Sequence, residues 1–254
     1  MKRILILYFS GVGVTKKVAQ FIHAQLSTTC DVDIISIESE DIPDINNYDS
    51  MIIGTPVHHA APARLVTSYL NAMPRLINET PAFIFNTRGL CSLNTNRILA
   101  KQLQKKNIVT IMDRAYRGPA SDGSIVAPFI KRFFEYEKNL EKKIASDCAD
   151  FLELLVDDTQ GYIPRFQLGS IINAPNKVAG QLITLKIQLY KDRCDRCKKC
   201  ISLCPYKAIS KDIEGYPLFI SKDCENCYRC IHHCPNLALS LSKKNPPKKV
   251  IRDI

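Results

Sequence analysis

Short apolar runs alternate with longer segments of helical spacing over the first 156 residues of the chain. The apolar runs predict strands over Lys2–Phe9, Val32–Ile37, Met51–Gly54, Ala82–Asn86 and Ile108–Met112. The spacing between these runs predicts helices over Val14–Leu26, Ala63–Met73 and Leu93–Lys105, and a long amphipathic stretch over Ser124–Val156. Strands that alternate with helices are typical of a parallel sheet that helices cover on both faces.

The pattern changes after Val156. Residues 157–190 are broken up by glycines and prolines, and we predict a connecting segment there. Residues 191–254 hold most of the cysteines and end in a basic, proline-broken tail, Lys243–Lys249, which we expect to fray at the surface. The sequence therefore predicts a large domain over 1–156, a linker over 157–190 and a small domain over 191–254.

The cysteines indicate metal binding. The chain has eleven of them, and eight lie between Cys194 and Cys234. The longest early apolar run, Ile4–Phe9, is far too short to span a bilayer and does not look like an export signal. Clustered cysteines in such a chain favour a metal site over disulfides, so we expect a cytoplasmic protein without a membrane span. The remaining cysteines are expected to be small buried hydrophobic residues: Cys30, Cys91 and Cys148.

Charge is distributed unevenly between the two parts. The chain carries a net charge of +10, with 18 basic and 18 acidic residues up to Gln160 and 17 basic against 7 acidic residues from Gly161 onward. The excess therefore belongs to the C-terminal part. It would attract an acidic partner, although the lysines could equally serve to keep the surface soluble.

One cysteine motif occurs twice near the C-terminus. It is Cys194-x2-Cys197-x2-Cys200-x3-Cys204-Pro205, repeated as Cys224-x2-Cys227-x2-Cys230-x3-Cys234-Pro235. Thiolates spaced by two residues can surround one corner of a cubane cluster while the backbone amides face its sulfides. Structural zinc is the alternative, but two triplets that are each followed by Cys-Pro leave awkward pairings for four-thiolate zinc sites.

Residues 191–241 resemble bacterial-type two-cluster ferredoxins, which implies a small α+β fold with two [4Fe–4S] clusters. In those proteins the cysteine before proline ligates the other cluster. The resemblance implies one cluster on Cys194, Cys197, Cys200 and Cys234, and a second on Cys224, Cys227, Cys230 and Cys204. Each oxidised cluster with its four thiolates carries about −2, so the C-terminal part would stay positive, at about +6.

Three loops follow predicted strands of the first domain. A glycine-bearing turn precedes the first helix, where free backbone N–H groups and the helix dipole favour a phosphate. Because open α/β sheets bind ligands at the carboxyl ends of their strands, we expect the three loops to form one site. The loops are Ser10-Gly11-Val12-Gly13-Val14-Thr15, then Gly54-Thr55-Pro56-Val57-His58, and Asn86-Thr87-Arg88-Gly89.

Together these loops resemble the flavodoxin family over residues 1–156. The resemblance implies a doubly wound parallel sheet of five strands and an FMN site, with the phosphate at the first loop and the flavin ring between the other two. Val12 and Val14 stand where the family usually has Thr and Asn, and His58 stands where an aromatic residue is common. We therefore expect weaker FMN binding than in relatives with the full loop. A flavodoxin-like scaffold that has lost its flavin is the alternative.

A flavodoxin-like domain followed by a two-cluster ferredoxin-like domain is similar to the flavodoxin–ferredoxin fusion proteins of anaerobes. We predict an electron-transfer protein that exchanges electrons between FMN, the clusters and an acidic redox partner of ferredoxin or flavodoxin type. No catalytic acid–base pair or nucleophile stands out, and the sequence does not fix the oligomeric state. A flavin-dependent reductase of a small acceptor is one alternative. Nucleic-acid binding is another, although the basic residues lack the interleaved aromatics that stack on bases.

Overall fold

The computed structural model describes residues 1–127, 129–157, 159–172, 186–241, 247 and 250–251. Its large domain holds a sheet of five parallel strands in the order β2-β1-β3-β5-β6. The strands are β1 (Arg3–Tyr8), β2 (Asp31–Ser36), β3 (Ser50–His58), β5 (Thr80–Arg88) and β6 (Ile108–Arg117). A two-residue strand, β4 (Ala61–Pro62), adds to β3 in antiparallel fashion. The predicted parallel sheet is therefore confirmed, with β4 as an addition.

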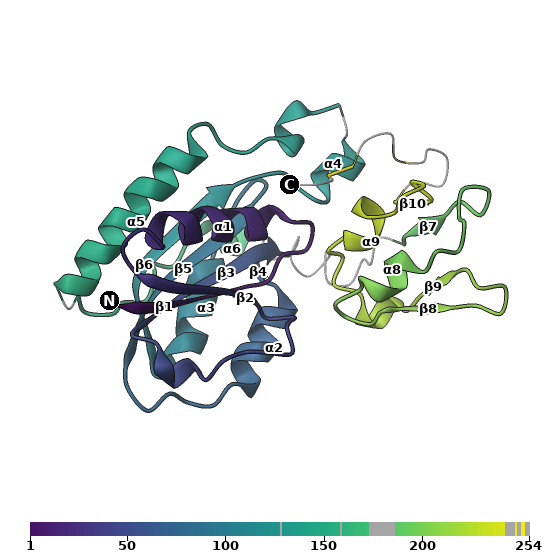
Figure 1. Ribbon diagram of the computed structural model, residues 1–254. Coiled ribbons are helices and arrows are strands. Elements are labelled where there is room, and N and C mark those ends of the chain that lie inside the picture. The colour runs from purple at the N-terminus through teal and green to yellow at the C-terminus, as the bar shows by residue number, and fades with distance from the viewer. Residues whose placement is uncertain (128, 158, 173–185, 242–246, 248–249, 252–254) are drawn as a thin grey trace.

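Helices cover both faces of this sheet, as Figure 1 shows. They are α1 (Val14–Leu26), α2 (Arg64–Ala72), α3 (Thr95–Gln104) and α5 (Leu140–Val156). Alternate residues of β1 point to opposite faces: Leu5 packs in the core under α2 and α3, and Ile6 in the core under α1 and α5. Apolar strands buried on both sides are characteristic of a doubly wound parallel sheet.

The stretch Ser124–Val156 is not one long helix. It contains two short turns, α4 (Gly123–Val126) and the 3₁₀ turn η2 (Lys131–Phe134), before α5 begins at Leu140. Pro128 interrupts the sequence, and Asn139 adopts a left-handed conformation immediately before α5. Phe129 is 82% exposed, so its helical spacing was misleading. The segment after β6 instead forms an irregular cover beside the strand ends.

The small domain is built from two similar halves, which confirms the expected α+β fold. Each half places a four-residue helix after its first two cysteines: α8 (Lys199–Ser202) and α9 (Arg229–His232). Two antiparallel pairs complete the domain. They join β7 (Gln188–Leu189) to β10 (Leu239–Ser240) and β8 (Ile209–Lys211) to β9 (Pro217–Phe219). A small core around Ile209, Ile231 and Leu239 holds the two halves together.

The predicted linker lies partly outside the described residues, and the predicted tail lies almost wholly outside them. The described part of 157–190 packs first on the large domain, where the Tyr162 amide donates to the Thr110 carbonyl and Ile163 joins the core. This part includes α6 (Gly169–Ile172), and short 3₁₀ turns lie elsewhere as η1 (Ile45–Asn47) and η3 (Ser221–Asp223). In the described part of the chain, no helix is both long and apolar enough to cross a membrane.

The three scattered cysteines differ in burial. Cys148 is buried in the core under α5, as expected. Cys30 is half-buried and Cys91 is exposed, so the expectation of a buried residue is wrong for Cys91. Cys91 follows β5 in a loop that lines the large cleft at the carboxyl ends of the strands, where it is open to solvent.

Candidate cofactor sites

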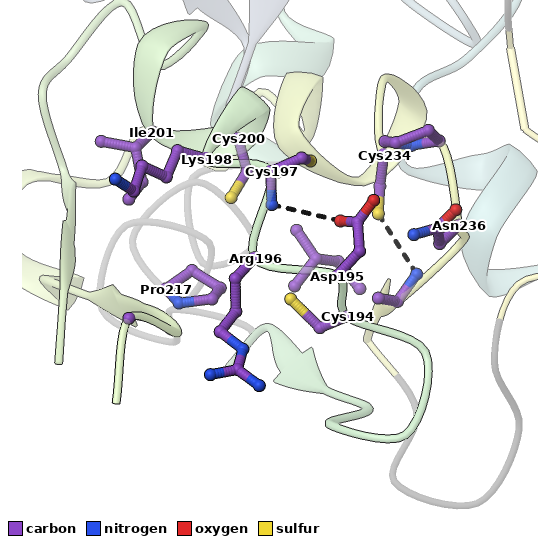
Figure 2. Close-up of a pocket in the computed structure, with 14 residues that line it drawn as sticks. Cys194, Asp195, Arg196, Cys197, Lys198, Cys200, Ile201, Pro217, Cys234 and Asn236 are labelled. Atoms are coloured by element: carbon purple, nitrogen blue, oxygen red, sulfur yellow. Dashed lines mark hydrogen bonds between the residues drawn. The ribbon is translucent and has the colours of Figure 1, made fainter. Parts of the chain in front are cut away.

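The first cysteine motif lies around a mainly apolar cavity, shown in Figure 2. Cys194, Cys197 and Cys200 line it from one side, and Cys234 of the second motif lines it from the other. The Cys197 amide donates to the Asp195 carboxylate at 3.1 Å, and the Ala238 amide donates to the Cys234 sulfur at 3.2 Å. The cavity therefore has three cysteines from one motif and the cysteine before proline from the other.

The second cavity mirrors the first. It is lined by Cys224, Cys227 and Cys230 together with Cys204, whose sulfur accepts from the Ala208 amide at 3.3 Å. The backbone explains the mirrored geometry. Left-handed residues stand at matched places in both motifs, at Arg196 and Lys198 in the first and at Asn226 and Tyr228 in the second. These turns curl each triplet around its cavity, and the last cysteine of each motif lines the cavity of the other.

The environment of the thiols favours a positively charged group. Burial, reinforced by neighbouring cysteines, raises the pKa of Cys230 well above its usual value. Burial likewise raises the pKa of Cys227 to about 12 and that of Cys200 to about 11. Thiolates so close together need a cationic core to become stable ligands. Donor set, apolar lining and amide donors to sulfur all fit an iron–sulfur cluster.

The two cysteine sets are more open than a site for a single metal ion. Among the residues that the structure describes, no three His, Cys, Asp or Glu side chains are grouped so that they could hold a metal ion. Each cysteine set instead surrounds a cavity. Which cysteine ligates which cluster remains a prediction, and the shared cavities agree with the crossed pairing.

The first loop of the large domain leads into α1 with free backbone donors. Gly13 caps the helix with φ of 102°, a conformation that favours glycine, and no side chain caps the first turn. No acidic side chain lies in that turn, so its N–H groups are available to an anion. The Ser10 hydroxyl accepts from the Gly13 amide at 3.1 Å. The Thr15 and Thr87 hydroxyls lie 2.8 Å apart and join the first loop to the third.

The three predicted loops meet at one cavity. Eleven of the fifteen residues in these loops line it. They are Ser10, Gly11, Val12, Val14, Thr15, Pro56, Val57, His58, Thr87, Arg88 and Gly89. The other four are Gly13, Gly54, Thr55 and Asn86. Thr55 accepts from the Ala63 amide, and Asn86 bonds with Asn96 and Ser92, so both side chains support the loops from behind.

Five further residues line the same cavity, and the sequence analysis missed them. They are Pro119, Ala120, Ser121 and Asp122, which follow β6, and Cys227 of the small domain. The rule that ligands bind at the carboxyl ends of parallel strands could have found the first four. Cys227 had already been assigned to a cluster, and no sequence pattern pointed from it to the first domain.

His58 lines this cavity and carries a buried polar atom. Its Nδ1 is buried and has no hydrogen-bond partner in the described part of the chain. Burial, together with neighbouring His59, lowers the pKa of His58 to about 4, so the ring is neutral near pH 7. A buried unpaired polar atom is costly unless a ligand satisfies it. The helix N-terminus and this atom together fit a phosphorylated flavin.

A larger cleft of about 610 Å³ continues from the cavity. It shares Val57, Gly89, Ala120 and Asp122 with the cavity. Most of its remaining lining is apolar and comes from the loop after β5 and from the segment around α4 and η2. The site can therefore accommodate a phosphate at α1 and a larger apolar group beside it.

Family models match both parts of the chain. The model of the flavodoxin domain matches residues 5–116, and the model of the 4Fe-4S dicluster domain matches residues 186–245. Over 67 residues, the chain is 39% identical to the pyruvate synthase subunit PorD of Pyrococcus horikoshii. This similarity covers 26% of the chain and 60% of that subunit, so the chain spans less than two thirds of this curated relative.

Solved flavodoxins are similar to the large domain at low identity. A flavodoxin from the domain Archaea is 11% identical with a TM-score of 0.45, and the match covers 61% of this chain and 99% of that one. The flavodoxin of Megasphaera elsdenii is 15% identical with a TM-score of 0.43, over 57% and 98% of the two chains. On the family models alone, residues 5–116 form a flavodoxin domain, which implies FMN, and residues 186–245 form a 4Fe-4S dicluster domain, which implies iron–sulfur clusters.

Proposed function

We propose that this protein is an electron-transfer iron–sulfur flavoprotein. One observation carries the proposal: Cys227 lines both the second cysteine cavity and the flavin cavity. A ligand of one cofactor would thus form part of the wall around the other. Such closeness suits electron transfer between the two cofactors, whereas clusters that only stabilised the fold would not need it.

Different residues of the chain would hold the flavin and the clusters. The first turn of α1 and the hydroxyls of Ser10 and Thr15 would hold the phosphate, while Val57 and His58 would lie along the flavin. The two crossed cysteine sets would hold two [4Fe–4S] clusters. When bound, the flavin supplies the ability to exchange electrons singly or in pairs, and each cluster exchanges one electron. Cysteines that bind clusters instead of forming disulfides are typical of a reducing compartment, so the proposed location is cytoplasmic.

An acidic redox protein is the proposed partner. Residues 191–199, around the first motif, contain five basic and two acidic side chains. Arg193, Arg196, Lys198 and Lys199 are all exposed there, beside the exposed Cys197. A basic rim around an accessible cluster would steer a negatively charged ferredoxin or flavodoxin toward it.

Cofactor analysis tests the proposal directly. Protein prepared without oxygen should contain about eight iron and about eight sulfide per chain. It should also bind one FMN. Stoichiometric zinc without acid-labile sulfide would overturn the cluster assignment, and failure to bind FMN in the presence of intact clusters would favour the flavin-free scaffold.

The cleft beside the flavin cavity favours a second candidate, a flavin-dependent reductase of a small acceptor. Leu90, Leu93, Val126, Ile130 and Phe133 give the cleft an apolar lining suited to an aromatic acceptor. Turnover of quinones or nitro compounds with reduced ferredoxin as the electron donor would support this function. Absence of turnover, with electron exchange intact, would leave the carrier function alone.

A further inference from the structure

Arg229 joins the small domain to the phosphate loop of the large one. Its Nη2 donates to the Ser10 carbonyl at 2.6 Å, and its Nε donates to the Gly11 carbonyl at 2.8 Å. Arg229 stands two residues after Cys227, whose Cβ lies only 3.6 Å from where a side chain on Gly11 would begin. The second cysteine motif therefore touches the loop that begins the flavin site.

The charge of Arg229 is already balanced inside the protein. Its two terminal nitrogens form a bidentate pair with Glu38, with both distances 2.7 Å, and its side chain is only 13% exposed. The guanidinium also lies over the Phe9 ring, 5.3 Å from its centroid, and donates to the Leu203 carbonyl. Because its donors are occupied by the protein, Arg229 acts on the loop by holding it, not as a ligand of the phosphate.

His232 makes a second connection from the same helix, α9. Its Nδ1 accepts from the Ile251 amide at 3.0 Å, so Nε2 carries the proton and donates to the Ser121 carbonyl at 2.8 Å. Ser121 lines the flavin cavity. The second motif thus reaches the cavity at two loops that lie more than a hundred residues apart in the sequence.

The first motif makes neither connection. Lys199 and Ser202 occupy the positions that Arg229 and His232 occupy in the repeat, and both are exposed. Figure 1 shows α9 between the large domain and α8. The short helix is therefore attached to the flavin site in the second motif, whereas its counterpart α8 exposes Lys199 and Ser202 to solvent.

We propose that the second cysteine motif is a structural part of the flavin site, and that Arg229 is the positioning residue that couples FMN binding to the docking of that motif. The inference rests on the proposed function, because it requires FMN in the cavity. It goes further by making flavin retention depend on a residue of the iron–sulfur domain. The coupling is reciprocal, so bound FMN should also stabilise the docked motif.

Titration with FMN tests the coupling. Full-length protein with both clusters loaded and FMN removed is titrated with FMN, and flavin fluorescence is followed. Arg229→Gln should weaken FMN binding by about 5- to 150-fold, the usual range for coupling between two sites. Lys199→Gln, at the matched position of the first motif, should leave the affinity unchanged. Equal affinities for Arg229→Gln and wild type would overturn the inference, whereas lack of FMN binding by wild type would overturn the proposed function itself.

Two further variants distinguish the hydrogen bonds of Arg229 to the loop from the effect of its positive charge. Arg229→Lys keeps the charge but lacks the planar fork, so most of the loss should remain. Glu38→Gln should also weaken FMN, by a smaller factor, since the pair that orients Arg229 is impaired. Full affinity in Arg229→Lys, or tighter binding in Glu38→Gln, would show that Arg229 acts through its charge. Iron content and circular dichroism confirm folding, and these two variants carry the test if Arg229→Gln does not fold.

Discussion

The two cysteine motifs have the same spacing and the same backbone turns, yet they lie in opposite environments. Around the first motif, residues 191–199 carry five basic and two acidic side chains, and Cys197 is exposed. Around the second, residues 221–229 carry two of each sign, and Cys227 is buried at 8% exposure. The comparison shows that spacing determines what a motif can bind, while its neighbours determine what the bound group can reach.

Because of this asymmetry, the two sides of the small domain face different surroundings. The first motif presents a charged, accessible surface to solvent, and the second is packed against the flavin cavity through Cys227 and Arg229. A duplicated unit can therefore serve two contacts at once, one with an external partner and one within the chain. The following variants test how far the two halves differ.

The clearest contrast should come from the exchanged cysteines. Cys204→Ser should damage the cluster of the second motif more than that of the first, because Cys204 lines the cavity of the second. About four of eight iron atoms should be lost per chain. Iron and sulfide analysis with EPR of the reduced protein measures this. Cys234→Ser is the matched control and should damage the other cluster; the reverse pattern would contradict the crossed assignment.

The two clusters should also differ in lifetime. Because Cys197 is exposed and Cys227 is buried, a chelator in air should remove the first cluster faster than the second. A difference of about 1.4 kcal/mol in the free energy of opening would give a tenfold ratio of rates. Loss of visible absorbance should then show two phases, with the faster one absent from Cys234→Ser. A single phase would mean that burial does not distinguish the clusters.

Charge at the first motif should control the encounter with the partner. Lys199→Glu should slow reduction by an acidic ferredoxin, by about threefold at low salt, and the wild-type rate should fall as salt screens the basic rim. Stopped-flow reduction at several salt concentrations measures both effects. Lys222→Glu, beside the second motif, is the control and should have a smaller effect. A rate independent of salt would remove the steering argument.

The smallest effect concerns the phosphate loop itself. Val12→Thr should tighten FMN binding by about tenfold at most, since a hydrogen bond to a charged group contributes about 1.5–3 kcal/mol and burying a hydroxyl opposes it. Val14→Asn should gain less, because Val14 packs with Val12, Ile251 and the ring of Tyr136. Flavin fluorescence titration measures both. If neither variant changes the affinity, the two valines do not limit FMN binding, and the contact of Arg229 with the loop becomes the feature to test.

The sequence alone determined the fold class and the chemistry. Apolar runs that alternate with segments of helical spacing were sufficient to predict the parallel sheet, because strands buried on both faces are apolar throughout. The cysteine spacing was sufficient for the clusters, since it constrains a few consecutive residues. Local patterns failed where a segment has no regular structure, as after β6, where Phe129 matched a helical spacing but is exposed.

Only the tertiary structure decided how the two domains meet. Nothing in the spacing of Cys194 or Cys224 distinguishes the motif that faces solvent from the one that lines the flavin cavity. That difference arises from contacts between residues about two hundred positions apart, such as Arg229 with Ser10 and Glu38. Such contacts depend on how whole domains pack, and a single sequence records that packing in no local pattern. Arg229 and Lys199 are basic residues at matched positions of the repeat, and only Arg229 is packed where its guanidinium reaches Ser10, Gly11 and Glu38.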